Sequence, residues 1–501
     1  MPLPVTEERI DPGARSGKSP CRGLPRGVST FSASRPPARA AVYRPHCRRA
    51  PELSGTVGGL HPSGERGVGA PESAQRSTAP PPYSGAPGGE VPLPHPAPLR
   101  PALLDAAAPL RRTGFLPTRA PLLTLPGPFQ AVPDLIPALA GAYAGSGVRP
   151  LIREATQAWP ADLTRQTEDL TPDERDALLA AAATLMHLYR WAAVPVHPDW
   201  FDETPDFPRA LEGLFRHLSA ARGLPPCGGL YTLKYLNWRS PDVAPGAAYD
   251  AATLHAGNVR IARSWHTGEA GEQLDLWLQT FVLAEARGQA VLVAGLDAVQ
   301  AAHEHDRDAL AGALEALHHA VRAVTREINV FTRFHVIRTD LWRVLIQPTF
   351  GWGLTEGRTL LEGASGLQLG ATQFADLALG VPFSGPLGAA LLASRAYLPP
   401  EQRALLSAWD AHHGDVRAAV QTWGDSRARD LYGACVQDME RWRVSHRERG
   451  AAYLRGDGQP HVMASTGTQF EAGVPHDQAF RDLMTTRVVD TRAQRLTPKE
   501  G

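Results

Sequence analysis

The sequence predicts an all-α fold from about residue 121 onward, and three observations lead to this prediction. Apolar residues recur at intervals of three or four over long stretches, as Leu310, Leu314 and Leu317 do, which places them on one helix face. Helix-start signatures also occur: Thr171-Pro172-Asp173-Glu174 offers a capping residue, a proline in the first turn and acids near the positive end of the dipole. The alternation of apolar and polar residues that is typical of strands is hard to find.

The predicted helices follow in chain order. The Thr171 signature leads into a helix over residues 177–191, and the leucine series belongs to a helix over residues 308–331. A further helical segment covers residues 368–379. Leu398-Pro399-Pro400-Glu401 opens the next helix, which continues through Leu405 and Trp409. The last long helix is predicted over residues 430–454.

Composition divides the chain into two parts. Residues 1–120 contain 16 basic and 8 acidic residues and 22 of the 46 prolines, whereas the remainder is acidic by 43 to 35. Such a stretch cannot bury enough apolar surface to offset its ordering entropy, so we expect a disordered tail over 1–120. Its scattered arginines also leave open a nucleic-acid arm or an organelle transit peptide, although a solvated tail is the commoner case. The rest is predicted to form a small helical domain (121–262), a large helical domain (263–485) and a flexible C-terminus (486–501).

Cysteine usage and hydropathy exclude several classes of protein. The four cysteines are far apart and form no Cys-x-x-Cys pair, which argues against a zinc site, a disulfide framework and a covalent c-type haem. No apolar run approaches the roughly 18 residues that cross a bilayer, and the N-terminus lacks the apolar core of a secretory signal. We therefore expect a cytoplasmic protein with neither a membrane nor a nucleic-acid partner.

His446 is the most informative residue of the chain. In the helix predicted over 430–454, it continues an apolar face that is formed by Cys435, Met439, Trp442, Gly450 and Tyr453. An imidazole that faces a dry interior needs a hydrogen-bonding side chain, a backbone carbonyl or a metal as its partner. A satisfied core histidine is the commoner outcome for one histidine taken alone.

The neighbours of His446 favour a cofactor. Arg443 precedes His446 by one helical turn, and its guanidinium can donate two hydrogen bonds to one carboxylate. Asp376 lies in another predicted helix, and we expect it to pair with Arg443. A haem needs this arrangement, with an axial nitrogen for the iron and a cation for a propionate. An ordinary surface arginine is the alternative for Arg443.

Other motifs carry less weight. The sequence has no phosphate-binding glycine loop, no Gly-x-Ser-x-Gly elbow and no His-Glu-x-x-His. His303-Glu304-His305-Asp306 has residue types that bind metals, but it lies in a polar connection between helices, where we interpret it as a solvated turn. His318-His319 and His412-His413 receive the same interpretation, because adjacent helical side chains diverge by about 100° and do not easily face one ion.

Beyond these single residues, several motifs resemble one family in their order and spacing. They cover roughly residues 224–468 and are Leu224-Pro225-Pro226, Leu236-Asn237-Trp238, Phe350-Gly351-Trp352, Gly363-Ala364-Ser365-Gly366-Leu367-Gln368, Gln373-Phe374-Ala375-Asp376, Tyr397-Leu398-Pro399-Pro400, Tyr432-Gly433-Ala434-Cys435, Arg443-Val444-Ser445-His446 and Ser465-Thr466-Gly467-Thr468. Each motif is weak alone, but together they resemble the indoleamine 2,3-dioxygenase superfamily. The members of this superfamily are haem enzymes that insert both atoms of O2 into the indole ring of tryptophan.

The resemblance implies a role for individual residues. His446 is similar to the proximal ligand of a haem b iron, Arg443 to the partner of a propionate, and Asp376 to the carboxylate that holds this arginine. Ser365 matches a serine near the haem edge and the substrate amine, and Thr280 falls where the family has a small hydroxyl residue over the distal face. Two further residues, Thr466 and Gly467, belong to a segment that resembles a mobile loop over the bound indole.

The chain departs from the family pattern in the distal pocket. Leu341 occupies the position at which the family has an aromatic residue that stacks on the indole. Ile346 occupies the position at which the family has an arginine that makes a bidentate contact with the substrate carboxylate. Isoleucine cannot replace that contact, which contributes on the order of a few kcal/mol in a dry pocket. Lys234 occupies a position that is apolar in the family, and Trp342 offers a flat surface. Two roles remain open for Lys234, which either binds a substrate or is simply solvated. For Trp342, packing in the core is the alternative to contact with a substrate.

The resemblance thus implies an all-α haem dioxygenase that acts on O2 and a small aromatic substrate, either tryptophan or another indole. We expect a monomer. Two alternatives stay open: a haem enzyme of secondary metabolism on the same scaffold, which acts on an aromatic other than tryptophan, and a haem protein that binds O2 without catalysis.

Overall fold

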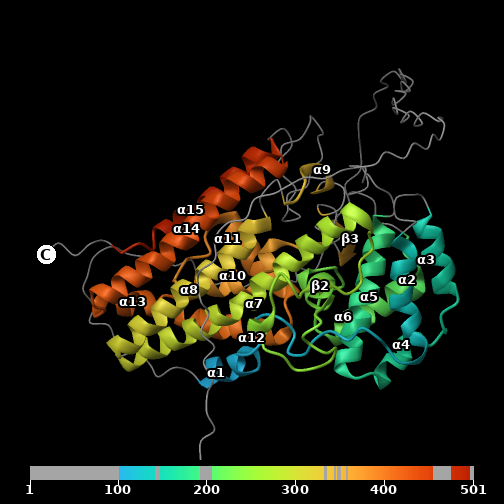
Figure 1. Cartoon of the computed structure of the whole chain (residues 1–501), viewed down its shortest axis with the longest axis horizontal. Coiled ribbons are helices and arrows are strands. Elements are labelled where there is room, and N and C mark those ends of the chain that lie inside the picture. The colour runs from blue at the N-terminus through green and yellow to red at the C-terminus, as the bar shows by residue number, and fades with distance from the viewer. Residues whose placement is uncertain are drawn as a thin grey trace, which may run out of the picture. The chain divides into compact units, whose positions relative to one another are not determined.

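The structure is a computed structural model. It describes residues 101–140, 147–191, 206–331, 336–342, 346, 351–356, 359–454 and 475–496. All of them belong to one unit of the chain, Glu90–Gly501. Most described residues are helical, which confirms the predicted fold class (Figure 1). The division of this unit into two domains at residue 262 stays a prediction.

The ordered chain begins earlier than predicted. Helix α1 (Pro101–Ala107) and the short helix η1 (Ala108–Leu110) lie within the segment that was expected to be a disordered tail. The Phe115 ring lies directly against Gly370, because a Cβ added at Gly370 would lie 2.2 Å from Cδ1 of Phe115. The Gln402 side-chain amide donates a hydrogen bond to the Phe115 carbonyl at 2.6 Å. The boundary at residue 120 is therefore wrong, because these apolar residues are buried by partners distant in sequence. Residues 1–100 of the predicted tail lie outside the described residues.

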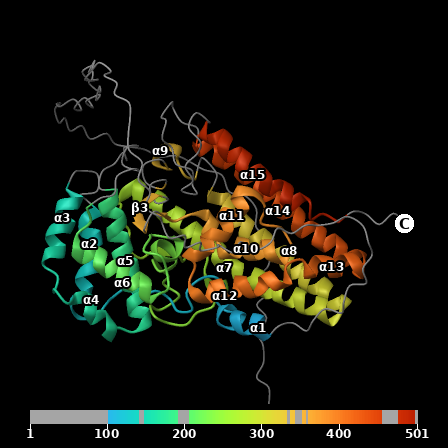
Figure 2. The same ribbon diagram turned by 180° about the vertical axis from the view of Figure 1, so that it is seen from behind.

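A group of helices surrounds the buried helix α5 and lies at one end of the unit in both views (Figures 1 and 2). It comprises α2 (Ala131–Ala140), α3 (Val148–Gln157), α4 (Leu163–Gln166), α5 (Pro172–Arg190) and α6 (Arg209–Ala221). The predicted start of α5 is confirmed. The Thr171 hydroxyl accepts from the Glu174 N–H, and the Glu174 carboxylate accepts from the Thr171 N–H, which satisfies two donors at the helix end.

Two small sheets interrupt the helices. The π-helix η5 (Tyr231–Tyr235) is followed by strand β1 (Trp238–Arg239), which pairs antiparallel with β2 (Arg260–Ile261). Strands β3 (Gly351–Glu356) and β4 (Thr359–Glu362) form a second antiparallel pair with an irregular register. The sequence analysis did not predict these strands, because segments this short show no usable alternation of apolar and polar residues.

Two long helices form the frame for the remaining elements. Helix α7 (Gly268–Glu304) turns back at His305 into α8 (Arg307–Phe331), so the two pack side by side over most of their length. Gly288 of α7 lets helix α10 (Gly370–Ala378) approach closely, since a Cβ at Gly288 would lie 2.3 Å from the Ala371 Cβ. This close contact determines where α10 presents its side chains.

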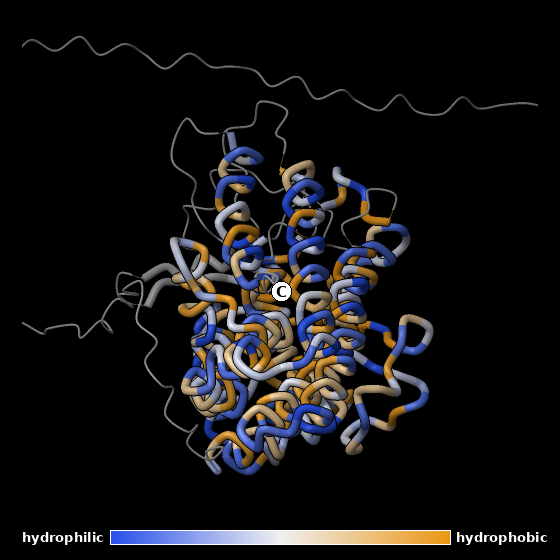
Figure 3. Tube along the Cα trace, turned by 90° about the vertical axis from the view of Figure 1, so that its left-hand side faces the viewer, coloured by the Kyte–Doolittle hydropathy of each residue, from blue (hydrophilic) through white to orange (hydrophobic). Residues whose placement is uncertain are grey.

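The C-terminal half adds further helices to this frame. They are α9 (Thr339–Leu341), η9 (Gly366–Gln368), α11 (Gly385–Ser394), η10 (Arg395–Tyr397), α12 (Pro400–Trp409), η11 (Asp410–His412), α13 (Asp415–Thr422), α14 (Ser426–Leu454) and α15 (His476–Arg492). The helices visible in Figure 3 contain both apolar and hydrophilic residues, as expected for amphipathic helices. Helix α15 packs along α14, so the predicted flexible C-terminus from residue 486 is wrong as far as Arg492. Among the described residues, none of the helices has the length and apolar character that a membrane crossing requires.

Candidate functional site

His446 lines a cavity between α14 and α15. The cavity has a volume of about 110 Å³ and is also lined by Phe281 of α7, Ile328 of α8 and Ser365. A small apolar cluster separate from the main core surrounds it and includes Leu387, Phe480 and Met484. The histidine that was predicted to face the interior therefore borders a largely apolar cavity.

The His446 imidazole is neutral and has a nitrogen without a partner. Its ring lies 6.0 Å from the Trp442 ring and 5.8 Å from the Phe480 ring. In the part of the chain that the structure describes, its buried Nδ1 has no hydrogen-bond partner. Burial lowers the pKa of His446 to about 4, so the ring carries no charge at neutral pH. A neutral imidazole is the form that binds a metal ion.

Asp376 holds two arginines beside this histidine. Its Oδ1 accepts from Arg443 and its Oδ2 accepts from Arg487, and all three side chains are almost fully buried. Arg443 also donates to the Thr491 hydroxyl, and Arg487 to the Pro382 carbonyl. Burial lowers the pKa of Arg443 to about 10, which leaves the guanidinium charged at neutral pH. The expected pairing of Asp376 with Arg443 is thus present in the structure, together with a second cation.

Sequence analysis missed Arg487, which lies beyond the predicted domain end at residue 485. The residue lines the cavity, and its buried Nε has no partner among the residues described. A signal was available, because Phe480, Met484, Arg487 and Thr491 follow one another at intervals of three or four. All four are buried on one face of α15. Half of that face is polar, so apolar periodicity alone did not reveal it.

Glu285 fixes the start of α10, the helix that carries Asp376. Its carboxylate accepts from the backbone N–H groups of Gly370 and Ala371 at 2.7 and 3.0 Å, and from the Tyr235 hydroxyl at 3.0 Å. Unsatisfied N–H groups at a helix start favour a negative charge. Burial nevertheless dominates and raises the pKa of Glu285 to about 7.

This raised pKa predicts a pH dependence of stability. A carboxyl group that keeps its proton in the fold but releases it near pH 4 when unfolded stabilises the fold at low pH. We expect the Glu285 contribution, on the order of 3 kcal/mol, to be full below about pH 4 and to be lost as pH rises through about 7. Urea unfolding of Glu285→Gln between pH 5 and 8 should show less of this decline than the parent. The variant Glu315→Gln, whose carboxylate is half exposed, should keep the parent's slope, and equal slopes for both variants would contradict the assignment.

Ser365 and Thr280 differ in their relation to the cavity. Ser365 lies at the bend before η9, where its hydroxyl accepts from the Leu367 N–H at 3.3 Å, and it lines the cavity. The Thr280 hydroxyl donates to the Leu276 carbonyl of its own helix at 2.9 Å. Thr280 is not part of the cavity lining, whereas its neighbour Phe281 is. The structure thus brings Ser365, but not Thr280, to the same space as His446.

Lys234 is one side chain away from the cavity. It is buried on η5, and its Nζ lies 3.3 Å from the ring centroids of both Trp277 and Phe281, the second of which lines the cavity. Burial lowers the pKa of Lys234 well below its ordinary value, whereas the two ring faces favour the charged form. Its Nζ has no hydrogen-bond partner among the described residues.

The other predicted pocket residues do not border the cavity in the described part of the chain. Leu341 packs against the core from α9. Trp342 is buried with its ring 5.1 Å from that of Tyr453, and Ile346 is fully buried. The predicted loop residues Thr466 and Gly467 lie outside the described residues. The substrate side of the site therefore stays a prediction.

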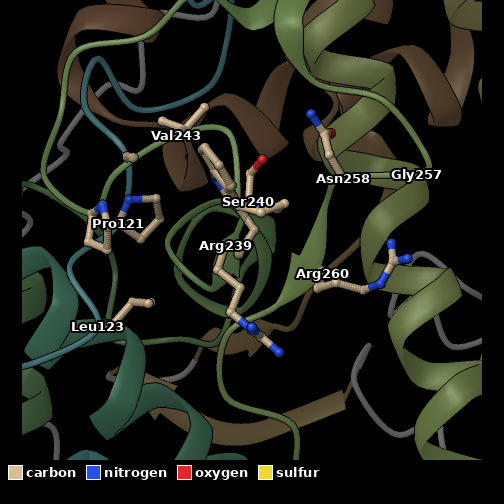
Figure 4. A pocket seen from close by; sticks show the side chains of 12 residues that line it. Pro121, Leu123, Arg239, Ser240, Val243, Gly257, Asn258 and Arg260 are labelled. Atoms are coloured by element: carbon tan, nitrogen blue, oxygen red, sulfur yellow. The ribbon is translucent and has the colours of Figure 1, made fainter.

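A larger cavity of about 330 Å³ lies elsewhere, between residues 120–123, 238–245 and 257–260. It contains none of the predicted site residues. Figure 4 shows that the guanidinium groups of Arg239 and Arg260 point in different directions and away from Val243. Catalytic and binding sites need polar groups that converge on one point, so the arrangement around His446 is the better candidate.

Comparison with known families supports one interpretation of the chain. Residues 110–336 match the family described as Indoleamine 2,3-dioxygenase. This match supports membership of the indoleamine 2,3-dioxygenase superfamily. The members of this superfamily are haem-dependent dioxygenases. No curated protein matches the chain. The matched residues end before Asp376, Arg443 and His446, so the roles of these three depend on their geometry.

The residues at the cavity fit the haem that this superfamily uses. The neutral His446 supplies an imidazole, the buried Arg487 Nε supplies a donor without a partner, and Arg443 supplies a second cation. Haem carboxylates take such donors. The cavity volume of about 110 Å³ is below the several hundred Å³ of ordinary ligand pockets. Binding therefore requires lining side chains such as the flexible Met484 to move.

Proposed function

We propose that this chain is a haem-dependent dioxygenase that inserts O2 into the pyrrole ring of an indole. The observation that carries the proposal is the neutral His446 imidazole at an apolar cavity, one helical turn from the buried Arg443. The match to the family over residues 110–336 supports the cofactor and the reaction class.

The proposed roles divide between holding the cofactor and keeping the site dry. His446 would hold the iron of haem b, and Arg443 and Arg487 would bind its propionates while Asp376 fixes their orientation. When bound, the haem supplies the binding and activation of O2 for attack on the electron-rich indole. In the proposed mechanism, no side chain has to act as an essential base. Its apolar lining excludes water and positions the substrate.

The residues proposed for the substrate pocket favour an indole whose recognition does not depend on a carboxylate. Ile346 is fully buried and apolar, so it offers no donor to an amino-acid carboxylate. Burying an unpaired carboxylate beside it would cost several kcal/mol. This observation keeps a second candidate function open: a haem enzyme on the same scaffold that acts on another aromatic compound.

Substrate preference is the direct test. With the haem reduced and O2 supplied, we expect kcat/KM for L-tryptophan to be no more than about tenfold above that for indoles without a carboxylate, such as tryptamine. A pocket built to pair the carboxylate would instead discriminate by about 10⁴-fold. Formation of N-formylkynurenine with that discrimination would contradict the proposed substrate class. A ferrous–O2 spectrum that persists with every indole would support the non-catalytic alternative.

A further inference from the structure

Two histidines and an aspartate meet at the end of α7, far from the cavity at His446. His303 lies in the last turn of α7, His412 ends η11, and Asp415 begins α13. On α7, His303 follows Phe281, which lines the cavity, by 22 residues, which corresponds to roughly 33 Å of helix. The interpretation of His303 as part of a solvated turn is therefore wrong, because its side chain is only 8% exposed and packs against His412.

Both imidazoles approach the same carboxylate oxygen. His303 Nε2 lies 2.9 Å and His412 Nδ1 3.1 Å from Asp415 Oδ2. One possible ligand atom from each of the three residues lies within 4.8 Å of the other two, and no other three histidine, cysteine or carboxylate side chains form such a group in the part of the chain that the structure describes. The ring centroids of the two histidines are 5.2 Å apart.

We propose that His303, His412 and Asp415 bind a Zn²⁺ ion, with water completing the coordination. Two imidazoles and one carboxylate are a ligand set that zinc accepts. Zinc bonds of about 2.0–2.1 Å in tetrahedral geometry separate the ligand atoms by about 3.3 Å. The two nitrogen–oxygen distances therefore need to widen by only a few tenths of an ångström, and rotation of the imidazoles adjusts the distance between the nitrogens.

The surroundings of the three side chains agree with this assignment. The imidazoles are held by packing, whereas the Asp415 side chain is 36% exposed, so water reaches the ion from the carboxylate side. The negative end of the α7 dipole favours a cation near His303. Asp415 also lies in the first turn of α13, where a carboxylate stabilises the helix without any metal. The experiment must therefore separate metal binding from helix stabilisation.

Zinc retention by the full chain is the measurement. The protein is stripped with a chelator, given one equivalent of zinc sulfate and dialysed, after which bound zinc is counted by mass spectrometry and Tm is measured by circular dichroism. We expect about one zinc per chain and a higher Tm with zinc than without it. His303→Ala and Asp415→Asn should each weaken zinc binding at least 100-fold and abolish the rise in Tm.

Two further variants make the result specific. His318→Ala removes a similar pair, in which His318 Nε2 lies 3.0 Å from Asp438 Oδ2 without a third ligand, and it should retain zinc. His446→Ala should also retain zinc, which excludes binding at the cavity. Asp415→Asn preserves size, so it decides the question even where His303→Ala fails to fold. Absence of zinc from the parent protein, or equal zinc retention by Asp415→Asn and the parent, overturns the proposal and leaves a hydrogen-bonded cluster.

Discussion

The His446→Ala variant is expected to purify without haem. The imidazole is the only proposed axial ligand, and alanine offers the iron no nitrogen. The parent protein, reconstituted with hemin, should show a Soret band that shifts on reduction with dithionite. In the variant we expect haem stoichiometry to fall by at least tenfold, measured as the pyridine haemochrome after gel filtration.

Two further proteins distinguish loss of the ligand from loss of the fold. His318→Ala, which alters a histidine paired with Asp438 on another face, should keep its haem. His446→Gly with added imidazole should recover a Soret band, because the free base can enter the space that the side chain vacates. Haem retention in His446→Ala equal to that of the parent would mean that another side chain holds the iron, and the proposed site would be wrong.

The Asp376→Asn variant is expected to show the largest loss of stability. Asparagine has nearly the shape of aspartate but no charge, so Arg443 and Arg487 would remain buried without their shared counter-ion. Removing one partner from a buried ion pair costs about 3–5 kcal/mol. We expect the free energy of unfolding to fall by about this amount in urea denaturation followed by circular dichroism.

The control is Glu315→Gln. Glu315 pairs with Arg427 at 2.7 Å, and both side chains are about half exposed, so its loss should cost no more than about 1 kcal/mol. If both variants lose the same stability, the buried network is no stronger than a surface ion pair. Haem retention by Asp376→Asn should also weaken, since both arginines lose the group that orients them.

Local patterns predicted the helices well because each depends on residues close together in the chain. The spacing around His446 predicted α14 and the inward imidazole, and the Thr171 signature predicted the start of α5, which its capping hydrogen bonds confirm. Asp376 was expected beside Arg443 from the helix positions and the family resemblance, and the structure brings the two together. Such patterns are sufficient to predict a structural feature when that feature depends on a single helix face or a single turn.

The features that sequence analysis missed depend on contacts between distant segments. His303 was judged beside its adjacent acids and histidine, whereas the structure pairs it with Asp415, which is 112 residues away in the chain. The segment around Phe115 looked disordered by composition, but Gly370 provides the space that orders it. Arg487 was placed in a flexible end, although α15 buries it against Asp376. No local pattern encodes these partners.

The position of α15 has a consequence for the maturation of the protein. This last described helix supplies Phe480, Met484 and Arg487 to the cavity wall, and Gly450 of α14 lets it dock closely, since a Cβ there would lie 2.8 Å from Phe480. During synthesis the cavity stays unfinished until these final turns leave the ribosome. If the proposed cofactor site is correct, we therefore expect cofactor binding to follow synthesis, and chains cut short near residue 475 to bind no cofactor.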